Sequence, residues 1–269
     1  MSYTFVCVCR LIDSMRAPPL TSNRVALLNG YAASGQLIDQ LAIANQRQPA
    51  IYLAETRMAL VRDTSFFGAT SPIYGGRSRI ELGRSLGTLN YTSLLADYRR
   101  YFMPRAPVTL ALRGVHFARY GRDAEHPQIA DLFLGYPELV RGYGIGSFDV
   151  RDCADRDAGG LCAVFNNLRG SRLAVANVEV RAPLVGLFTG EFNYGRVPVE
   201  LVAFFDAGLA WTSTTKPAFA GGTRELVRSA GGAARINLFG IAVLEVSAAR
   251  PLDRLNLGWQ WQVGLRQGF

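Results

Sequence analysis

Long segments in which apolar and polar residues alternate are the strongest constraint on how this chain folds. Near the carboxyl end the odd positions are Leu257, Trp259, Trp261, Val263 and Leu265, and the positions between them hold only glycine and glutamine. Successive side chains of a β-strand point to opposite faces, so this pattern predicts a strand with one wholly apolar face.

Nine such segments are predicted as strands, and most of them are longer than the strands of soluble proteins. They are residues 50–62, 77–87, 91–102, 108–120, 172–184, 199–211, 228–238, 241–249 and 257–269. A strand that crosses a bilayer at a tilt needs about 9–11 residues, whereas soluble strands most often have about 5–6. The lengths favour an antiparallel transmembrane β-barrel over a β-sandwich.

The second face of the middle strands carries charge. Alternation puts Asn177, Glu179 and Arg181 on one face of residues 172–184, and Asp206 on the matching face of residues 199–211. Carboxylates beside an arginine suit the polar interior of a membrane barrel and are costly in a dry core. We therefore expect Glu179 and Asp206 to face the lumen.

Composition agrees with a barrel and disfavours other classes. Hydrophobic residues make up 49% of the 269 residues and the mean hydropathy is +0.11, yet no apolar run has the ~20 residues of a membrane helix. The net charge is +8, but Lys216 is the only lysine and no run of five basic residues occurs. We expect no binding of nucleic acid.

Enzyme motifs are missing from the sequence. There is no G-x-S-x-G elbow, P-loop, H-E-x-x-H or dinucleotide fingerprint, and the glycines of residues 142–147 lack the lysine of a phosphate loop. A hydrolase built on His116 or His126, or paired acids among the strand carboxylates, is the alternative. Hydrogen bonding in a lumen explains the acids more simply, so we expect no enzyme, no cofactor and no metal site.

Two cysteines lie in the predicted long loop of residues 121–170. Cys153 and Cys162 flank a polar stretch, and a disulfide between them would stabilise the protein by about 2–3 kcal/mol in an oxidising compartment. A zinc site is the alternative, which the two histidines and the lack of C-x-x-C spacing disfavour. The role of Cys7 and Cys9 is left open.

Residues 1–48 are weakly patterned, and the barrel domain is expected over residues 49–269. Residues 24–32 suggest one strand, and residues 36–46 suggest a strand or a short helix. The apolar patch of residues 3–9 has no basic residue before it and no small-x-small cleavage site after it. We expect either a misassigned start or a fragment that begins inside the barrel.

The order of four motifs resembles a known family. Residues 138–143 (Glu-Leu-Val-Arg-Gly-Tyr) precede residues 170–184, then residues 204–208 (Phe-Phe-Asp-Ala-Gly), then a strand that ends on Phe269. This order resembles the carboxy-terminal half of the BamA/TamA-type bacterial surface antigen family over residues 71–269. The resemblance implies a barrel of the bacterial outer membrane, present here as a partial barrel of about nine to ten strands out of sixteen.

The resemblance also implies a function. Members assemble other barrels or move polypeptide across the outer membrane, so the expected partners are outer-membrane lipid and unfolded outer-membrane proteins or secreted polypeptide. The alternative is a passive outer-membrane pore or surface antigen without insertase activity.

Residue roles follow from the same resemblance. In the family the loop with Val140, Arg141, Gly142 and Tyr143 folds back into the barrel, and its arginine contacts acids on inner strand faces. The matching positions are Glu179 and Asp206, which alternation independently places in the lumen. The alternative is that Arg141 is a solvated loop residue.

The carboxyl end is expected to act as an assembly signal, because the family pattern ends in an aromatic residue after alternating apolar ones. The signal would comprise Trp259, Trp261, Val263, Leu265 and Phe269. The alternative is that Phe269 is simply the last lipid-facing residue.

Overall fold

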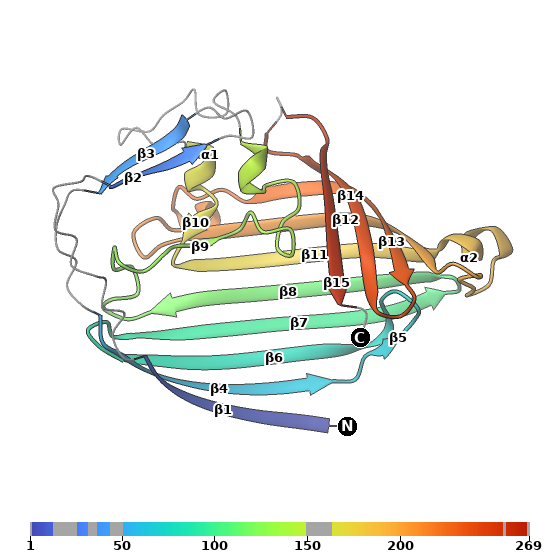
Figure 1. Ribbon diagram of the computed structural model, residues 1–269, viewed down its shortest axis with the longest axis horizontal. Helices are drawn as coiled ribbons and strands as arrows, with labels where there is room; N and C mark the ends of the chain where they lie inside the picture. The colour runs from blue at the N-terminus through green and yellow to red at the C-terminus, as the bar shows by residue number, and fades with distance from the viewer. Residues whose placement is uncertain are drawn as a thin grey trace.

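A computed structural model describes residues 2–12, 26–31, 37–43, 51–148, 163–254 and 257–267. Most of their strands form one curved antiparallel sheet (Figure 1). The order is β1-β4-β6-β7-β8-β11-β12-β13-β14-β15, with β5 paired to β6. The bounds are β1 (Ser2–Ile12), β4 (Leu53–Asp63), β5 (Phe66–Phe67), β6 (Pro72–Gly87), β7 (Tyr91–Arg105), β8 (Val108–Tyr120), β11 (Arg172–Pro183), β12 (Val199–Trp211), β13 (Val227–Leu238), β14 (Ala242–Pro251) and β15 (Gln260–Gln267). Because β1 and β15 end this order, the sheet is a partial barrel, and the predicted fold class is confirmed.

Smaller elements lie outside this sheet. Strands β2 (Ala26–Tyr31) and β3 (Leu37–Ile43) pair with each other, as do β9 (Leu132–Phe133) and β10 (Arg169–Gly170). Among the described residues the helices are α1 (Ala163–Asn166), α2 (Leu184–Thr189), η1 (Ile145–Ser147) and η3 (Ala218–Ala220). None of the helices in the described ranges has the length and apolar character needed to span a bilayer.

The nine predicted strands all occur, and all but residues 108–120 and 199–211 have shifted ends. The strand predicted at residues 172–184 ends at Pro183. Proline offers no N–H to the strand ladder, and Leu184 already begins α2. The last strand begins only at Gln260, so Leu257 and Trp259 precede it. Of residues 36–46 the structure describes residues 37–43, and these form the strand β3.

Strand β1 is absent from the sequence prediction. Its residues are Ser-Tyr-Thr-Phe-Val-Cys-Val-Cys-Arg-Leu-Ile, in which neither set of alternate positions is polar throughout. The period-2 signal is therefore weak, and only pairing with β4 over its whole length identifies the strand.

Burial along the strands is inverted relative to a soluble protein. In β11 the buried set includes Asn177, Glu179 and Arg181, whereas Val178 and Val180 between them are exposed. Large apolar side chains are exposed on further strands: Met58, Leu60, Ile80, Leu82, Phe205, Trp261, Val263 and Leu265. So extensive an apolar surface suits contact with lipid hydrocarbon rather than water.

The main apolar core lies between the inner face of the sheet and the long loop after β8. Leu134, Val140 and Tyr143 of the loop are each 0% exposed, and they pack with Leu173 and Val175 of β11. The loop is thus part of the folded interior.

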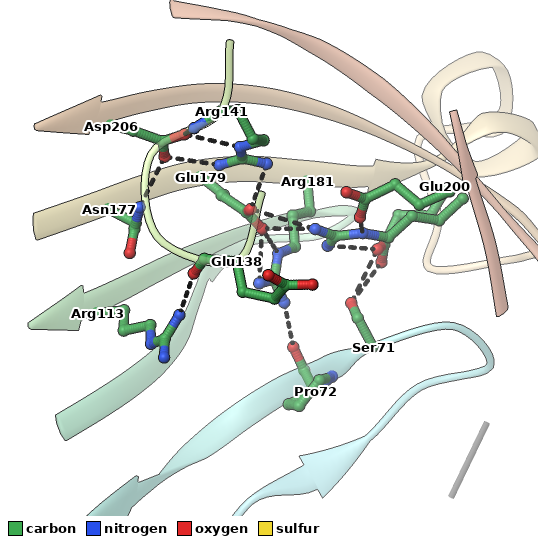
Figure 2. Close-up of polar contacts among 12 residues, drawn as sticks. Ser71, Pro72, Arg113, Glu138, Arg141, Asn177, Glu179, Arg181, Glu200 and Asp206 are labelled. Carbon is green, nitrogen blue, oxygen red and sulfur yellow. Dashed lines mark hydrogen bonds and ion pairs between the residues drawn. The ribbon is translucent and has the colours of Figure 1, made fainter. Parts of the chain in front are cut away.

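A second segment, residues 64–72, follows β4 and ends at the first residue of β6, and it contacts strands that are not neighbours of β6 in the sheet. Ser71 Oγ donates to both carboxylate oxygens of Glu200 on β12, at 2.9 and 2.8 Å. Arg181 on β11 donates to the carbonyl of Pro72 at 3.3 Å, as Figure 2 shows. We call this segment the strap, because it ties the two halves of the curved sheet together.

The inverted burial predicts how a charge on the outer face behaves. Val178 lies near the middle of β11 on that face, so Val178→Arg should lower the free energy of unfolding in phospholipid vesicles by about 2–4 kcal/mol. Urea titration followed by tryptophan fluorescence measures this loss. Val178→Thr, which keeps the shape without charge, is the control, and equal tolerance of both substitutions would contradict a lipid-facing position.

Candidate functional site

The loop residues 138–143 lie against the inner faces of neighbouring strands (Figure 2). Arg113 of β8 donates through Nη1 to the carbonyl of Glu138 at 2.6 Å. Asn177 of β11 donates through Nδ2 to the carbonyl of Leu139 at 2.8 Å. Side chains from two adjacent strands therefore fix the loop backbone just before Arg141.

Arg141 points into the inner wall and is held by two carboxylates. Its Nε and Nη2 donate to the two oxygens of Asp206, both at 2.7 Å, and its Nη1 donates to Oε1 of Glu179 at 2.9 Å. Its backbone N–H also donates to Asp206, at 3.2 Å. The guanidinium carbon lies 3.5 Å from the centroid of the Phe204 ring, which adds a cation–π contact. We call Arg141, Glu179 and Asp206 the latch.

The latch is almost fully removed from solvent. Arg141 is 4% and Asp206 0% exposed. Burial alone would lower the pKa of Arg141. The hydrogen bonds with Asp206 and the charge of Glu179 raise this pKa by more than burial lowers it, so the guanidinium stays charged. Breaking a buried pair by removing one partner typically costs about 3–5 kcal/mol, since the remaining charge is left without compensation.

The spacing of residues 204–208 explains how β12 receives the loop. Phe204, Asp206 and Gly208 alternate with outward residues and share the inner face. Phe204 lies under the guanidinium, Asp206 binds it, and Gly208 leaves room for Val140. A Cβ at Gly208 would lie 2.6 Å from Cγ2 of Val140, closer than side-chain atoms approach.

The last two residues of the motif carry the loop on to β13 and β14. Gly142 has φ +85°, a conformation that other residues rarely adopt, and a Cβ there would lie 3.1 Å from Pro251 at the end of β14. Tyr143 is fully buried, and its hydroxyl donates to the carbonyl of Arg228 on β13 at 2.9 Å. Burial raises the pKa of this phenol. The loop thus spans the inner face from β8 to β14.

Glu179 joins the latch to a wider charge network. It accepts hydrogen bonds from Arg181 at 2.8 Å and from Arg235 of β13 at 3.1 Å, in addition to the loop arginine. Arg235 in turn lies 3.6 Å from Glu200, the carboxylate that receives the strap. The loop and the strap therefore meet through one set of buried ion pairs.

Other residues singled out in the sequence lie elsewhere. The ring nitrogens of His116 lie 3.0 Å from the carbonyl of Leu173 and 3.1 Å from the hydroxyl of Tyr120, and Asp97 accepts from Arg113. These contacts form no nucleophile–base pair. No group of three or more potential metal ligands gathers within the part of the chain that the structure describes.

The predicted disulfide lies outside the described residues, and the predicted assembly signal lies only partly within them. Cys153, Cys162 and Phe269 lie outside the described residues. Trp259, Trp261, Val263 and Leu265 are all exposed, with Trp261 at 73%. Both ideas stay predictions.

Several site residues escaped sequence reasoning. Phe204, Arg113 and Arg235 contribute to the latch or its network, but neither a motif nor their spacing names their partners. Asn177 and Arg181 did carry a signal, because alternation placed both on the inner face beside Glu179.

Comparison with known proteins bears on this arrangement. A family model described as the Omp85 superfamily domain matches residues 62–266, well over half of the chain. The chain belongs to the Omp85 superfamily. It is accordingly a β-barrel protein of the bacterial outer membrane, in a superfamily associated with assembly and translocation at that membrane.

A solved structure supports the same fold for this Omp85 barrel. BamA from Haemophilus ducreyi lacking POTRA domains 1-3 matches with a TM-score of 0.51 and 15% sequence identity, over 81% of this chain. The match covers 44% of that BamA chain, so this chain spans less than half its length. No curated protein matches the chain.

Removing the latch arginine should free the loop of this Omp85 barrel without unfolding the sheet. Arg141→Ala removes the positive charge that pairs with the buried Asp206 and one of the arginines that pair with Glu179, so proteolytic cleavage within residues 138–148 should accelerate on the order of 100-fold, while circular dichroism shows an intact β-sheet. Arg141→Lys should restore little, because an ammonium cannot make the bidentate contact with Asp206. Arg122→Ala is the control in the same loop, since Arg122 has an 84% exposed side chain. Cleavage of the Arg141→Ala loop at the wild-type rate would refute the latch.

The contact between Val140 and Gly208 gives a rescue experiment. Gly208→Ala should displace the loop and speed its cleavage, because the added Cβ meets Val140. Val140→Ala removes the opposing methyl, so the double variant should be cut more slowly than Gly208→Ala alone, with a coupling of about 0.5–3 kcal/mol. Simple additivity of the two effects would show that the two residues do not meet.

Proposed function

We propose that this chain takes part in inserting or translocating polypeptide at the bacterial outer membrane, as the BamA/TamA-type resemblance implies. The observation that carries the proposal is the buried latch, in which Arg141 binds Asp206 and Glu179 on the inner wall. A loop fixed to the inner wall by buried ion pairs is a folded internal element, and a polypeptide that enters the barrel would contact it.

The inner face itself disfavours a passive pore. Residues 138–148 lie along that face from β8 to β14, and the strap crosses it near Glu200. The loop is held by charged side chains and by the apolar core around Val140 and Tyr143, and the strap is held by its hydrogen bonds with Glu200 and Arg181. A wide aqueous channel needs a lumen that such segments leave clear.

The edges of the sheet supply a route for insertion. Strands β1 and β15 end the order of the sheet, and a strand edge presents N–H and C=O groups to which another chain can pair. The exposed apolar face of β15, with Trp261, Val263 and Leu265, would let a newly paired strand continue the lipid-facing surface. The proposed partner is an unfolded outer-membrane protein.

Reconstitution tests the proposal. The full chain in phospholipid vesicles should accelerate the folding of a urea-unfolded, eight-stranded barrel protein over vesicles alone, as measured by its gel mobility shift. Arg141→Ala should reduce this acceleration at least tenfold, whereas Arg122→Ala should leave it unchanged. If the wild-type chain conducts ions across the vesicle membrane but does not accelerate folding, the passive pore is correct and the proposal fails.

A further inference from the structure

Charge is divided unevenly between the two faces of the main sheet. Residues that pair across neighbouring strands share a face. The register places inward every carboxylate on the described strands of this sheet: Glu55, Asp63, Glu81, Asp97, Glu179, Glu200, Asp206 and Glu245. The outward positions of the same strands hold no carboxylate, but they hold arginines, among them Arg84, Arg100 and Arg172. The charge on the outer face is therefore positive.

Two of these arginines lie at the end of the sheet next to the long loop. Arg84 of β6 pairs in register with Thr92 of β7, and Thr92 pairs with Tyr120, the last residue of β8. Arg172 is the first residue of β11 and lies beside the same end of β8. Arg84, Thr92, Tyr120 and Arg172 thus form one outward-facing group across four adjacent strands, which we call the rim cluster.

The two guanidinium groups of the rim cluster approach each other from opposite sides. Arg84 donates through Nη1 to the hydroxyl of Thr92 at 3.0 Å, so its guanidinium reaches toward β7. The guanidinium carbon of Arg172 lies 4.9 Å from the centroid of the Tyr120 ring, so this group reaches toward β8. Because adjacent strands are only about 4.8 Å apart, both groups are within reach of a single anion.

Neither arginine of the rim cluster forms an ion pair with a described carboxylate. The bond to the threonine is the only hydrogen bond from Arg84 to a described residue, and Arg172 donates none to the described residues. Glu125 of the long loop is near enough to act electrostatically on Arg172, but it accepts a hydrogen bond from Ser171 instead. Two neighbouring cations repel each other, and an anion between them would offset that repulsion.

The outer face beside the rim cluster is apolar. Leu82 pairs with Leu94 two residues nearer the middle of β6 and β7, and the side chains of Ile80 and Leu82 are exposed. Membrane barrels carry an apolar band that ends in aromatic girdles at the two interfaces. Trp211, which pairs with Arg172, is such an aromatic residue at the loop-side end. The rim cluster thus lies at the level of the lipid headgroups, next to a surface that suits acyl chains.

We propose that the rim cluster binds the phosphate group of a membrane lipid, whose acyl chains lie against Leu82 and Leu94. The guanidinium groups of Arg84 and Arg172 offer paired N–H donors that match the oxygens of a phosphate. The hydroxyl of Thr92 accepts from Arg84 and keeps its own hydrogen to donate to the same phosphate. This site lies on the outer face, apart from the latch, and does not depend on the proposed function.

Short-chain lipids test the site in the full chain, held in a neutral detergent. Isothermal titration should show saturable binding of dihexanoyl phosphatidic acid. Dihexanoylglycerol, which lacks the phosphate, and inorganic phosphate, which lacks the acyl chains, should each bind at least tenfold more weakly. Equal binding of dihexanoylglycerol would show that the charge plays no part, and equal binding of inorganic phosphate would show that the lipid plays none. Either result would overturn the proposal.

Matched variants locate the binding. Arg84→Gln and Arg172→Gln should each weaken binding of the phosphatidic acid by about tenfold, the loss expected for one charge-assisted hydrogen bond. Arg100→Gln removes the same charge from the outer face toward the other end of β7, so it should bind as the wild type does. Arg84 is exposed, so its variant remains informative even if Arg172→Gln fails to fold. Wild-type affinity in Arg84→Gln, or an equal loss in Arg100→Gln, would contradict a site at the rim cluster.

Discussion

The contact of Arg141 with Asp206 and Glu179 is the interaction on which the interior of this barrel depends. A guanidinium that is 4% exposed needs compensation, and Asp206 on β12 and Glu179 on β11 supply it in a fixed geometry. Because Asp206 is fully buried, it would lose the positive charge that pairs with it if the loop withdrew, whereas Glu179 would keep Arg181 and Arg235. The loop and the wall therefore stabilise each other, and the surrounding contacts of Phe204 and Gly208 fit that one arrangement.

The same charges organise the sheet around the latch. Glu179 also accepts a hydrogen bond from Arg235. Arg235 in turn pairs with Glu200, which accepts a hydrogen bond from Ser71 of the strap. Two segments that are distant in sequence thus converge on strands β11–β13 from within. The outer face of this sheet is apolar and faces lipid, so no element of the described chain packs on that side to stabilise the curvature. In this protein the curvature is stabilised from the inside, by ion pairs and by the core beneath the loop.

Much of this fold could be predicted from the sequence, because the alternation of apolar and polar residues is a local property of each strand. Residues 108–120 and 199–211 are strands with the predicted ends, and the inward placement of Glu179 and Asp206 needs only the period of two. Strand β1 was missed because its sequence alternates poorly: one set of alternate positions is apolar or aromatic, and the other mixes valine and isoleucine with polar residues. The strap escaped for a different reason: the bond from Ser71 to Glu200 spans 129 residues, and no local pattern encodes a contact at that separation. The cation–π contact of Phe204 with Arg141 likewise depends on where the loop lies against β12, which no local pattern encodes.

Hydrogen exchange at the backbone amide of Arg141 tests the central claim most directly. That N–H donates to Asp206 inside a wall where the side chains are buried. In the membrane-embedded wild-type chain the account predicts exchange as slow as that of β11 and β12 amides, and much faster exchange in Asp206→Ala. Exchange at the rate of an open loop in the wild type, or no change on losing Asp206, would contradict it.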